Sequence, residues 1–336
     1  MPRLLAVVLL LASLAAPSPA QAQDITGPAQ PTTGPGGRDY AYDEVVGQHF
    51  GEPPSGYWLF EPVVDDAEAD GRPPHPIVIL LHGYTATDPA FLGAWIDHVV
   101  RQGRVVIFPD YQIEDPLGEP PLEYTGNMID GITAAMAELE TGDHVDTRRD
   151  DLAVAGYSMG AVLALNYAAM AVGLGLPVPI AVMAVTPGGC TGCGGPGGSN
   201  EFGVPYRDLS RIETATKLLL IVGEDDDFVG ARPAQLAWEQ TAQIPADNRD
   251  YLVARSDDHG TPALVADHSF PSNAGSLTEV DALDWYGTFK WLDGLSGCAV
   301  QPPICDDTMN GGATQLDMGE WSDGTPVLPP LVVDDP

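Results

Sequence analysis

Basic residues are scarce in this sequence. The chain of 336 residues has 14 lysines and arginines against 48 aspartates and glutamates, which gives a formal net charge of −34 at pH 7. Such a negative surface repels nucleic acids and anionic membranes, so we expect neither as a partner. The acidic residues are scattered and form no calcium-loop pattern, which favours a solvated acidic surface over a specific cation site.

Long hydrophobic runs are missing as well. The apolar run at residues 4–16 is too short to span a bilayer, and no later segment approaches the required length. This run follows Arg3 and precedes a small-x-small cleavage pattern at Ala20 and Ala22, an arrangement typical of a signal peptide. We therefore predict that residues 1–22 are removed on export and that the protein is secreted or periplasmic, with no membrane span.

Cysteine is rare, with four residues in the chain. An even number in an exported protein suggests two disulfides. Proximity favours Cys190 with Cys193 and Cys298 with Cys305, although four cysteines permit three pairings. A redox role for the first pair is disfavoured because it lies in a glycine-rich stretch and not at a helix start beside a strand. No second cysteine pair or histidine pair lies at ligand spacing, so the sequence predicts no metal site and no cofactor.

Continuous apolar runs alternate with helical patterns through the middle of the chain. Such runs are typical of strands buried on both faces of a parallel sheet. The alternation predicts an α/β fold in which a mostly parallel central sheet has helices on both faces. The predicted strands are 57–63, 76–82, 104–109, the run ending at Gly156, 180–186, 217–222 and 251–254, and the predicted helices are 90–100, 128–139, 161–169 and 280–292.

The flanking segments predict the domain organisation. Residues 23–38 are rich in proline, glycine, threonine and glutamine, which predicts a flexible leader. Residues 39–297 have a length that suits one domain with a single core. Residues 298–336 are rich in proline, glycine and aspartate, and we expect a surface extension pinned by a disulfide.

One serine lies where a predicted strand turns directly into a predicted helix. The apolar run ends at Gly156, Ser158 follows, and a small-residue helical pattern begins after Gly160. The glycines of this Gly-x-Ser-x-Gly arrangement are needed because a Cβ on either side of the strained turn would collide with neighbouring backbone. The turn holds the serine hydroxyl at the edge of the sheet, which makes Ser158 a candidate nucleophile.

A serine hydroxyl needs a base to accept its proton and an acid to orient that base. In open α/β sheets such groups gather beyond the carboxyl ends of the strands, so they are expected in the loops that follow the predicted strands. The loop after 217–222 offers carboxylates at 225–227, and His259 and His268 follow the last predicted strand. The order serine, acid, histidine is that of an α/β-hydrolase.

Negative charge develops on the substrate's carbonyl oxygen during acyl transfer, and two backbone N–H groups are expected to stabilise it. One belongs to Met159, the residue after the nucleophile, and the other to Tyr84, in the loop after 76–82. His82 is expected to pack and hydrogen-bond beneath that loop and not to react. The remaining histidines show no partner pattern and are expected to be ordinary surface or boundary residues: His49, His75, His98 and His144.

The segments at 83–86 (Gly-Tyr-Thr-Ala) and 156–160 (Gly-Tyr-Ser-Met-Gly) together resemble the secreted polyester hydrolases and cutinase-like lipases of bacteria. That family lies within the dienelactone-hydrolase-like branch of the α/β-hydrolases, and the resemblance covers roughly residues 55–292. It implies an α/β-hydrolase fold without a large lid, an oxyanion hole formed by Tyr84 and Met159, and a tyrosine ring that lines the acyl groove.

The same resemblance selects the acid and favours one of the two bases. The family's acid stands ahead of one variable residue and an apolar pair, which selects Asp226 over Asp225 and Asp227. The sequence around His268 resembles the family's small-x-His-aromatic loop. His259 comes directly after the last predicted strand and stays an alternative base.

These residues imply a monomeric serine hydrolase that cleaves small-molecule or polymeric carboxylic esters through an acyl-enzyme, without a cofactor. Only a glycine-rich loop and a short helical stretch lie between 180–186 and 217–222, which leaves little room for a lid and favours short-chain or bulky esters. Two alternatives stay open. One is a peptidase or amidase on the same fold; the other is an inert binding protein, which would lack a triad member, and none is missing here.

Overall fold

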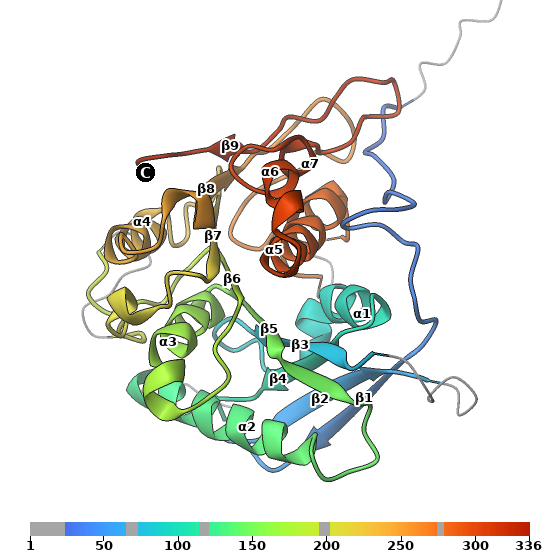
Figure 1. The fold of residues 1–336 in the computed structure, drawn as a ribbon. Coiled ribbons are helices and arrows are strands. Elements are labelled where there is room, and N and C mark those ends of the chain that lie inside the picture. The colour runs from blue at the N-terminus through green and yellow to red at the C-terminus, as the bar shows by residue number, and fades with distance from the viewer. Residues whose placement is uncertain (1–23, 65–72, 114–120, 195–201, 274–278) are drawn as a thin grey trace, which may run out of the picture.

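The computed structural model describes residues 24–64, 73–113, 121–194, 202–273 and 279–336. Within these ranges nine strands form one mostly parallel sheet in the order β1-β2-β4-β3-β5-β6-β7-β8-β9 (Figure 1). The predicted α/β class is therefore confirmed. The signal peptide predicted for residues 1–22 lies outside the described residues.

Parallel strands form the centre of the sheet, and antiparallel strands form both edges. Strands β3 to β8 run parallel, whereas β1 pairs with β2, β2 with β4 and β9 with β8 in the antiparallel sense. The strands are β1 (Val45–Phe50), β2 (Tyr57–Pro62), β3 (His75–Leu81), β4 (Val105–Pro109), β5 (Thr147–Tyr157), β6 (Ala181–Val185), β7 (Lys217–Gly223), β8 (Arg249–Ala254) and β9 (Leu331–Val332).

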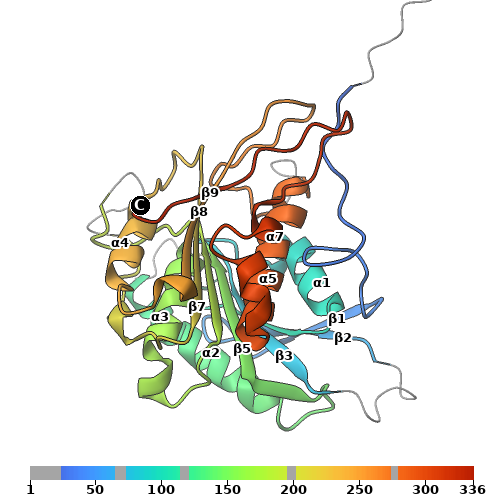
Figure 2. The ribbon, with the colours of Figure 1, turned by 45° about the horizontal axis from the view of Figure 1, so that its top comes forward.

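Helices cover both faces of the sheet, as predicted (Figure 2). One face is packed by α2 (Tyr124–Glu138), α3 (Met159–Leu174) and α4 (Arg232–Gln240), and the other by α1 (Gly93–Arg101) and α5 (Lys290–Val300). The central strands are buried and mainly apolar toward their carboxyl ends, where each lies between two such layers, whereas β5 and β8 begin with charged residues. The shorter segments are η1 (Pro89–Leu92), η3 (Pro121–Glu123), η4 (Leu209–Arg211), η5 (Ala246–Asn248), the π-helical η6 (Asp284–Phe289), η7 (Pro302–Ile304), α6 (Cys305–Thr308) and α7 (Ala313–Leu316).

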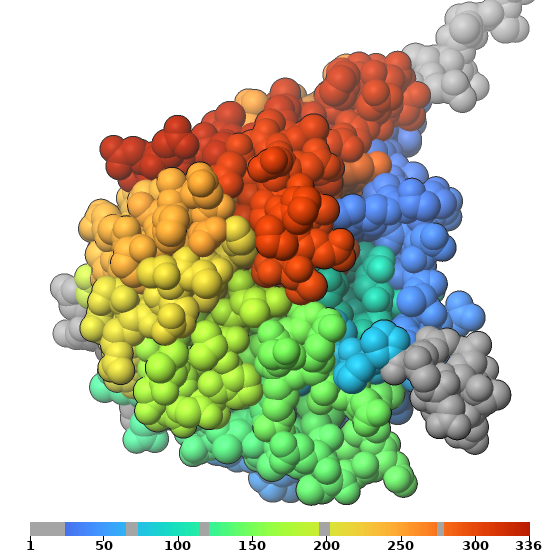
Figure 3. Space-filling model, viewed as in Figure 1, coloured from blue at the N-terminus to red at the C-terminus, as the bar shows by residue number. Residues whose placement is uncertain are grey.

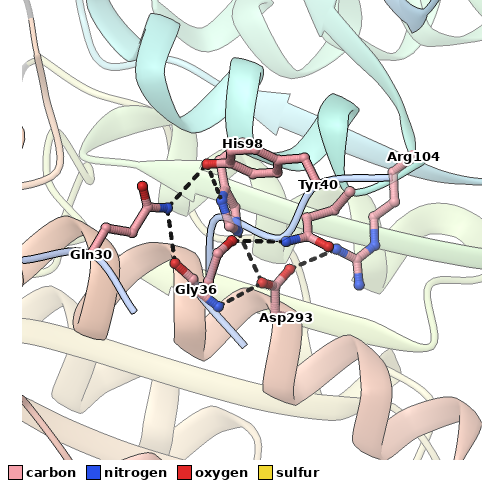
Figure 4. Close-up of polar contacts among 8 residues, drawn as sticks. Gln30, Gly36, Tyr40, His98, Arg104 and Asp293 are labelled. Carbon is pink, nitrogen blue, oxygen red and sulfur yellow. Dashed lines mark hydrogen bonds and ion pairs between the residues drawn. The ribbon is translucent and has the colours of Figure 1, made fainter. Parts of the chain in front are cut away.

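The N-terminal segment (residues 24–38) packs on the domain and is not the flexible leader predicted from its composition. Gly36 donates its backbone N–H to Asp293 of α5 at 2.9 Å (Figure 4). A Cβ at Gly36 would lie 2.0 Å from the carbonyl oxygen of Trp285, so only glycine permits this approach. Glycine serves close packing here, and composition does not distinguish that use from flexibility.

A buried carboxylate holds the N-terminal segment in place. The Oδ2 atom of Asp293 accepts the Gly36 N–H and lies 2.9 Å from His98 Nε2, and Oδ1 accepts from Arg104 Nη1 at 2.7 Å. The hydroxyl of Tyr40 lies 3.2 Å from the other ring nitrogen of His98 (Figure 4). His98 is 1 % exposed, so it is a buried partner of a carboxylate and not the ordinary boundary residue that we predicted.

The C-terminal segment (residues 298–336) is part of the domain. The predicted boundary at 298 falls inside α5, and β9 adds an edge strand next to β8. Met309 and Trp321 are buried in the core on the α1 and α5 side, because apolar side chains in the segment find a place there. Figure 3 shows the segment, in red, packed against the surface of the molecule.

The N-terminal segment contacts the C-terminal segment. Thr26 donates its N–H to the Ser322 hydroxyl at 2.9 Å, and Ser322 donates its own N–H to the Thr26 carbonyl oxygen at 2.9 Å. Thr261, in the loop after β8, donates to the carbonyl oxygen of Ile25 at 2.8 Å. The N-terminal segment is thus attached to parts of the chain that follow it by more than two hundred residues.

Both predicted cysteine pairs lie at disulfide-bonding distance. The Cα atoms of Cys190 and Cys193 are 5.6 Å apart, and those of Cys298 and Cys305 are 4.6 Å apart. The first pair lies in the loop after β6, and the second joins α5 to α6. None of the helices in the described ranges combines the length and apolar character needed to cross a bilayer.

Candidate active site

Backbone strain concentrates at one edge of the sheet. Five non-glycine residues among those described have positive φ angles. Four of them lie in the loops that follow β3, β4, β5 and β6: Thr85 (65°), Tyr111 (41°), Ser158 (55°) and Thr186 (43°). Each such residue costs about 1–3 kcal/mol and persists only where its surroundings enforce it, which is typical of functional sites. The strained loops follow the carboxyl ends of neighbouring strands.

Ser158 lies at the sharp turn that the glycine pattern predicted. β5 ends at Tyr157, α3 begins at Met159, and Ser158 between them has φ 55° and ψ −118°. A Cβ at Gly156 would lie 2.2 Å from the Gly160 carbonyl oxygen, and one at Gly160 would lie 2.1 Å from the carbonyl oxygen of Leu81. The glycines are therefore required by contacts within the turn and with the end of β3.

The structure brings Ser158, His268 and Asp226 together from three loops. His268 Nε2 lies 2.9 Å from Ser158 Oγ, and His268 Nδ1 lies 2.8 Å from Asp226 Oδ2. Ser158 follows β5, His268 follows β8 and Asp226 follows β7, and the carboxyl ends of these strands lie at the same edge because the strands are parallel. The three form one continuous hydrogen-bonded chain.

Asp226 is placed to orient the imidazole. Its side chain is 1 % exposed, and Oδ1 accepts the backbone N–H groups of Phe228 at 3.1 Å and Val229 at 3.0 Å. Both carboxylate oxygens thus have partners, which a buried charge requires. Because a carboxylate only accepts, the proton of a neutral His268 lies on Nδ1, and Nε2 is left to accept from the Ser158 hydroxyl.

His259, the alternative base, makes no hydrogen bond to Ser158. Its Nε2 atom lies 2.9 Å from Asp323 Oδ2, in the C-terminal segment. Its ring also contacts Trp321, with the ring centroids 5.9 Å apart. Both acids that flank Asp226 are exposed, and Asp225 accepts from the Ser256 hydroxyl. The structure therefore places one histidine and one of the three neighbouring acids at the serine.

The predicted oxyanion donors flank the serine. Met159 is the first residue of α3, so its N–H is one of the donors that have no acceptor within the helix. Tyr84 belongs to the β3 loop (residues 82–86), which lies against the turn, since a Cβ at Gly83 would be 3.4 Å from the Ser158 Cβ. On another side, a Cβ at Gly188 would be 3.3 Å from the Ser158 Oγ. Glycine at 188 therefore keeps a side chain away from the hydroxyl of Ser158, a residue that is 8 % exposed.

His82 packs beneath the β3 loop, as predicted. It is fully buried, its Nδ1 lies 2.7 Å from the Gly83 carbonyl oxygen, and its Nε2 lies 2.8 Å from the Asp110 carbonyl oxygen. Its ring stacks on Tyr111, with centroids 4.1 Å apart. Burial lowers the pKa of His82 to about 4, and the hydrogen bonds to the Gly83 and Asp110 carbonyl oxygens oppose this shift.

Sequence reasoning missed the side chains that surround the catalytic candidates. Phe228 is 72 % exposed, and its ring centroid lies 5.1 Å from that of His268. It borders a cavity of about 350 Å³ whose other lining residues are Asp225, Asp227, Asp267, His268 and Ser269. Tyr111 and Gln112, which are fully buried behind the β3 loop, were missed as well. The one sequence feature that could have indicated a role for them is their position directly after the predicted strand at 104–109, because functional groups are expected in such loops.

Comparison with models of known protein families and with curated proteins found no match to this chain. The described residues contain no group of three or more histidine, cysteine, aspartate or glutamate side chains placed to hold a metal ion. The assignment of this site therefore depends on its geometry and chemistry.

Proposed function

We propose that this protein is an exported serine hydrolase that cleaves carboxylic esters through an acyl-enzyme. The observation that carries the proposal is the hydrogen-bonded chain from Ser158 Oγ through His268 to Asp226, with distances of 2.9 and 2.8 Å. Nucleophile and base within hydrogen-bonding reach, with the base oriented by a third group, are the signature of an activated serine.

The arrangement of the sheet supports an α/β-hydrolase fold. The nucleophile follows a buried parallel strand and opens a helix, the acid follows β7, and the histidine follows β8. This gives the chain order serine, acid, histidine that distinguishes α/β-hydrolases from other serine hydrolases. The strained backbone of Ser158 supports the same assignment.

In the proposed acylation step, Ser158 Oγ attacks the ester carbonyl carbon while His268 Nε2 takes the hydroxyl proton. Asp226 stabilises the imidazolium that forms and keeps its own charge. The tetrahedral intermediate collapses when the C–O bond to the alcohol breaks, and His268 gives its proton to the departing alcohol oxygen. The acyl group is then bound to Ser158 as an ester.

Deacylation repeats these steps with water. His268 takes a proton from water as its oxygen attacks the acyl carbon, and the proton passes to Ser158 Oγ when the bond to the acyl group breaks. In both steps the N–H groups of Met159 and Tyr84 would stabilise the oxyanion. One such donor is worth about 3 kcal/mol of transition-state stabilisation in comparable enzymes.

We further propose that short-chain or bulky esters are preferred over long acyl chains. Between β6 and β7 the described residues form only the three-residue η4, and Phe228, which is 72 % exposed, lies beside the base. Since the described part of that stretch contains no helix of lid size, an extended alkyl chain would not be buried on all sides.

A fluorophosphonate probe tests the central claim, because only an activated serine reacts with it. We expect labelling at Ser158 in the wild-type chain and none in Ser158→Ala, with a loss in kcat on chromogenic esters of about 10⁶-fold. A matched panel of anilides separates an esterase from an amidase. Labelling that is absent from the folded wild type would indicate an inert binding protein, and highest activity on the longest acyl esters would contradict the open site.

A further inference from the structure

The loop that follows β4 holds the β3 loop from behind. Gln112 Oε1 accepts the backbone N–H of Thr85 at 2.9 Å, and the Tyr111 hydroxyl donates to the carbonyl oxygen of His82. The carbonyl oxygen of Asp110 lies 2.8 Å from His82 Nε2. Asp110 and Tyr111 thus contact the β3 loop at His82, and Gln112 contacts it at Thr85.

Gln112 also reaches the other predicted oxyanion donor. Its Nε2 lies 4.0 Å from Met159 Sδ, and its side chain has no exposed surface. A thioether accepts a hydrogen bond weakly, so this contact is mainly one of packing. A single buried amide therefore contacts the residue after Tyr84 on one side and the side chain of Met159 on the other.

The β3 loop needs such support because its turn is strained. Ala86 donates its N–H to the Gly83 carbonyl oxygen at 3.1 Å, which makes Tyr84 and Thr85 the central residues of a four-residue turn. Thr85 has φ 65°, which is rare for a β-branched residue and normally calls for glycine or asparagine at this turn position. Relaxation of Thr85 to negative φ would turn over the peptide between Tyr84 and Thr85, whose N–H is the one that Gln112 accepts.

We propose that Gln112 is a positioning residue that holds the strained β3 loop in the conformation in which the Tyr84 and Met159 N–H groups both point at the oxyanion. This inference rests on the proposed function, since it assigns a supporting residue to that site. Gln112 has no contact with Ser158, His268 or Asp226 among the hydrogen bonds of the described residues, so its effect would be on the oxyanion and not on the base.

Gln112→Met tests the proposal because it removes the amide and keeps an unbranched side chain of similar length. The informative measurement is the ratio of kcat for an oxygen ester to kcat for the matching thionoester. Sulfur is the weaker hydrogen-bond acceptor, so an intact oxyanion hole favours the oxygen ester and a disturbed one favours it less. We expect kcat on the oxygen ester to fall about 10- to 100-fold, less than for complete loss of a donor, with a lower ratio and little change in KM.

Two further variants separate positioning from general destabilisation. Gln315→Met makes the same substitution at a glutamine that is 1 % exposed and bonds to Asp250 and Gly311, and we expect its ratio to equal that of the wild type. Tyr111→Phe deletes only the hydroxyl that bonds to His82, so it tests the same loop if Gln112→Met does not fold. We expect a lower ratio in Tyr111→Phe and an unchanged pH profile of kcat/KM in both loop variants.

The proposal would be overturned if Gln112→Met and Tyr111→Phe fold and keep the wild-type ratio of kcat for the oxygen ester to kcat for the thionoester. It would also be overturned if Gln315→Met lowered that ratio by the same factor. A shifted pH profile would also count against it, because that would place the effect on the base. An inactive wild-type chain without labelling at Ser158 would overturn the proposed function together with this inference. An active chain with unaffected loop variants would overturn this inference alone.

Discussion

Replacing Asp293 by asparagine should destabilise the protein through the loss of one buried charge. The asparagine can keep its oxygen toward Gly36 and His98, but its amide group then faces Arg104, which is itself a donor. Losing a hydrogen bond to a charged partner costs about 1.5–3 kcal/mol, and breaking a buried ion pair costs about 3–5 kcal/mol. Arg104 keeps 17 % of its side chain exposed, so water offsets part of this loss. We therefore expect a loss of about 3 kcal/mol at pH 7, since the lower end of the buried-pair range applies.

The effect should depend on pH in a defined direction. Burial alone would raise the pKa of Asp293, but the charges and hydrogen bonds of His98, Arg104 and Gly36 outweigh burial and hold it well below its usual range. A carboxyl whose pKa is lower in the folded chain than in the unfolded chain stabilises the fold at any pH above its unfolded-state pKa, about 3.9 for aspartate. This stabilisation is lost as the pH falls through the folded-state pKa. The difference in the free energy of unfolding between wild type and Asp293→Asn should therefore have its largest value at pH 7 and shrink below about pH 4.

Thermal melts at pH 7 and pH 3 provide the assay. A loss of about 3 kcal/mol corresponds to a fall in Tm of roughly 6–12 °C for a domain of this class. Asp323→Asn is the matched control, because Asp323 also lies 2.9 Å from a histidine nitrogen but on the surface, where an ion pair contributes little. A fall of less than 2 °C in Asp293→Asn, or the same fall in Asp323→Asn, would refute the reasoning.

Three further predictions concern the site and the buried charges. Asp226→Asn should lower kcat on esters by about 10⁴-fold with a small change in Tm, because asparagine favours the wrong imidazole tautomer; full activity would contradict the triad. Burial lowers the pKa of Lys290 to about 7, so above that pH the unfolded chain binds more protons than the folded one. The free energy of unfolding in urea should therefore rise between pH 7 and 10, and Lys290→Met should abolish this rise. Asp225, Asp227 and Asp267 border the cavity beside the imidazole, so kcat/KM should be higher for cationic than for anionic esters, and the difference should shrink in 1 M salt; a preference for anions would contradict this.

Local patterns predicted much of the fold and site because their causes are local. The apolar runs predicted the central strands, and the glycines around Ser158 predicted a turn that neighbouring backbone atoms would otherwise block. Parallel strands end at one edge, and the loops after them bring Asp226 and His268 together with Ser158. The resemblance favoured His268 over His259, and in the structure His268 lies 2.9 Å from Ser158 Oγ whereas His259 bonds to Asp323.

Features that depend on distant partners could not be predicted. His98 and Asp293 are separated by 195 positions, and no spacing indicates that one is buried against the other. The glycines at 34–37 indicate backbone freedom but not the carboxylate that Gly36 meets. Gln112 shows the same limit, because its role arises from contact with a loop of another strand.

The meeting of Thr26 with Ser322 sets an order on folding during synthesis. Thr26 cannot form its hydrogen bonds until Ser322, which lies 296 positions later in the chain, has been synthesised. At the ribosome's pace of about 5–20 residues per second, that delay is roughly 15–60 s. Throughout this interval the early strands can pair among themselves, while the face that the N-terminal segment covers stays open to chaperones and proteases. The hydrogen bonds between the two segments form only after Ser322 has been made.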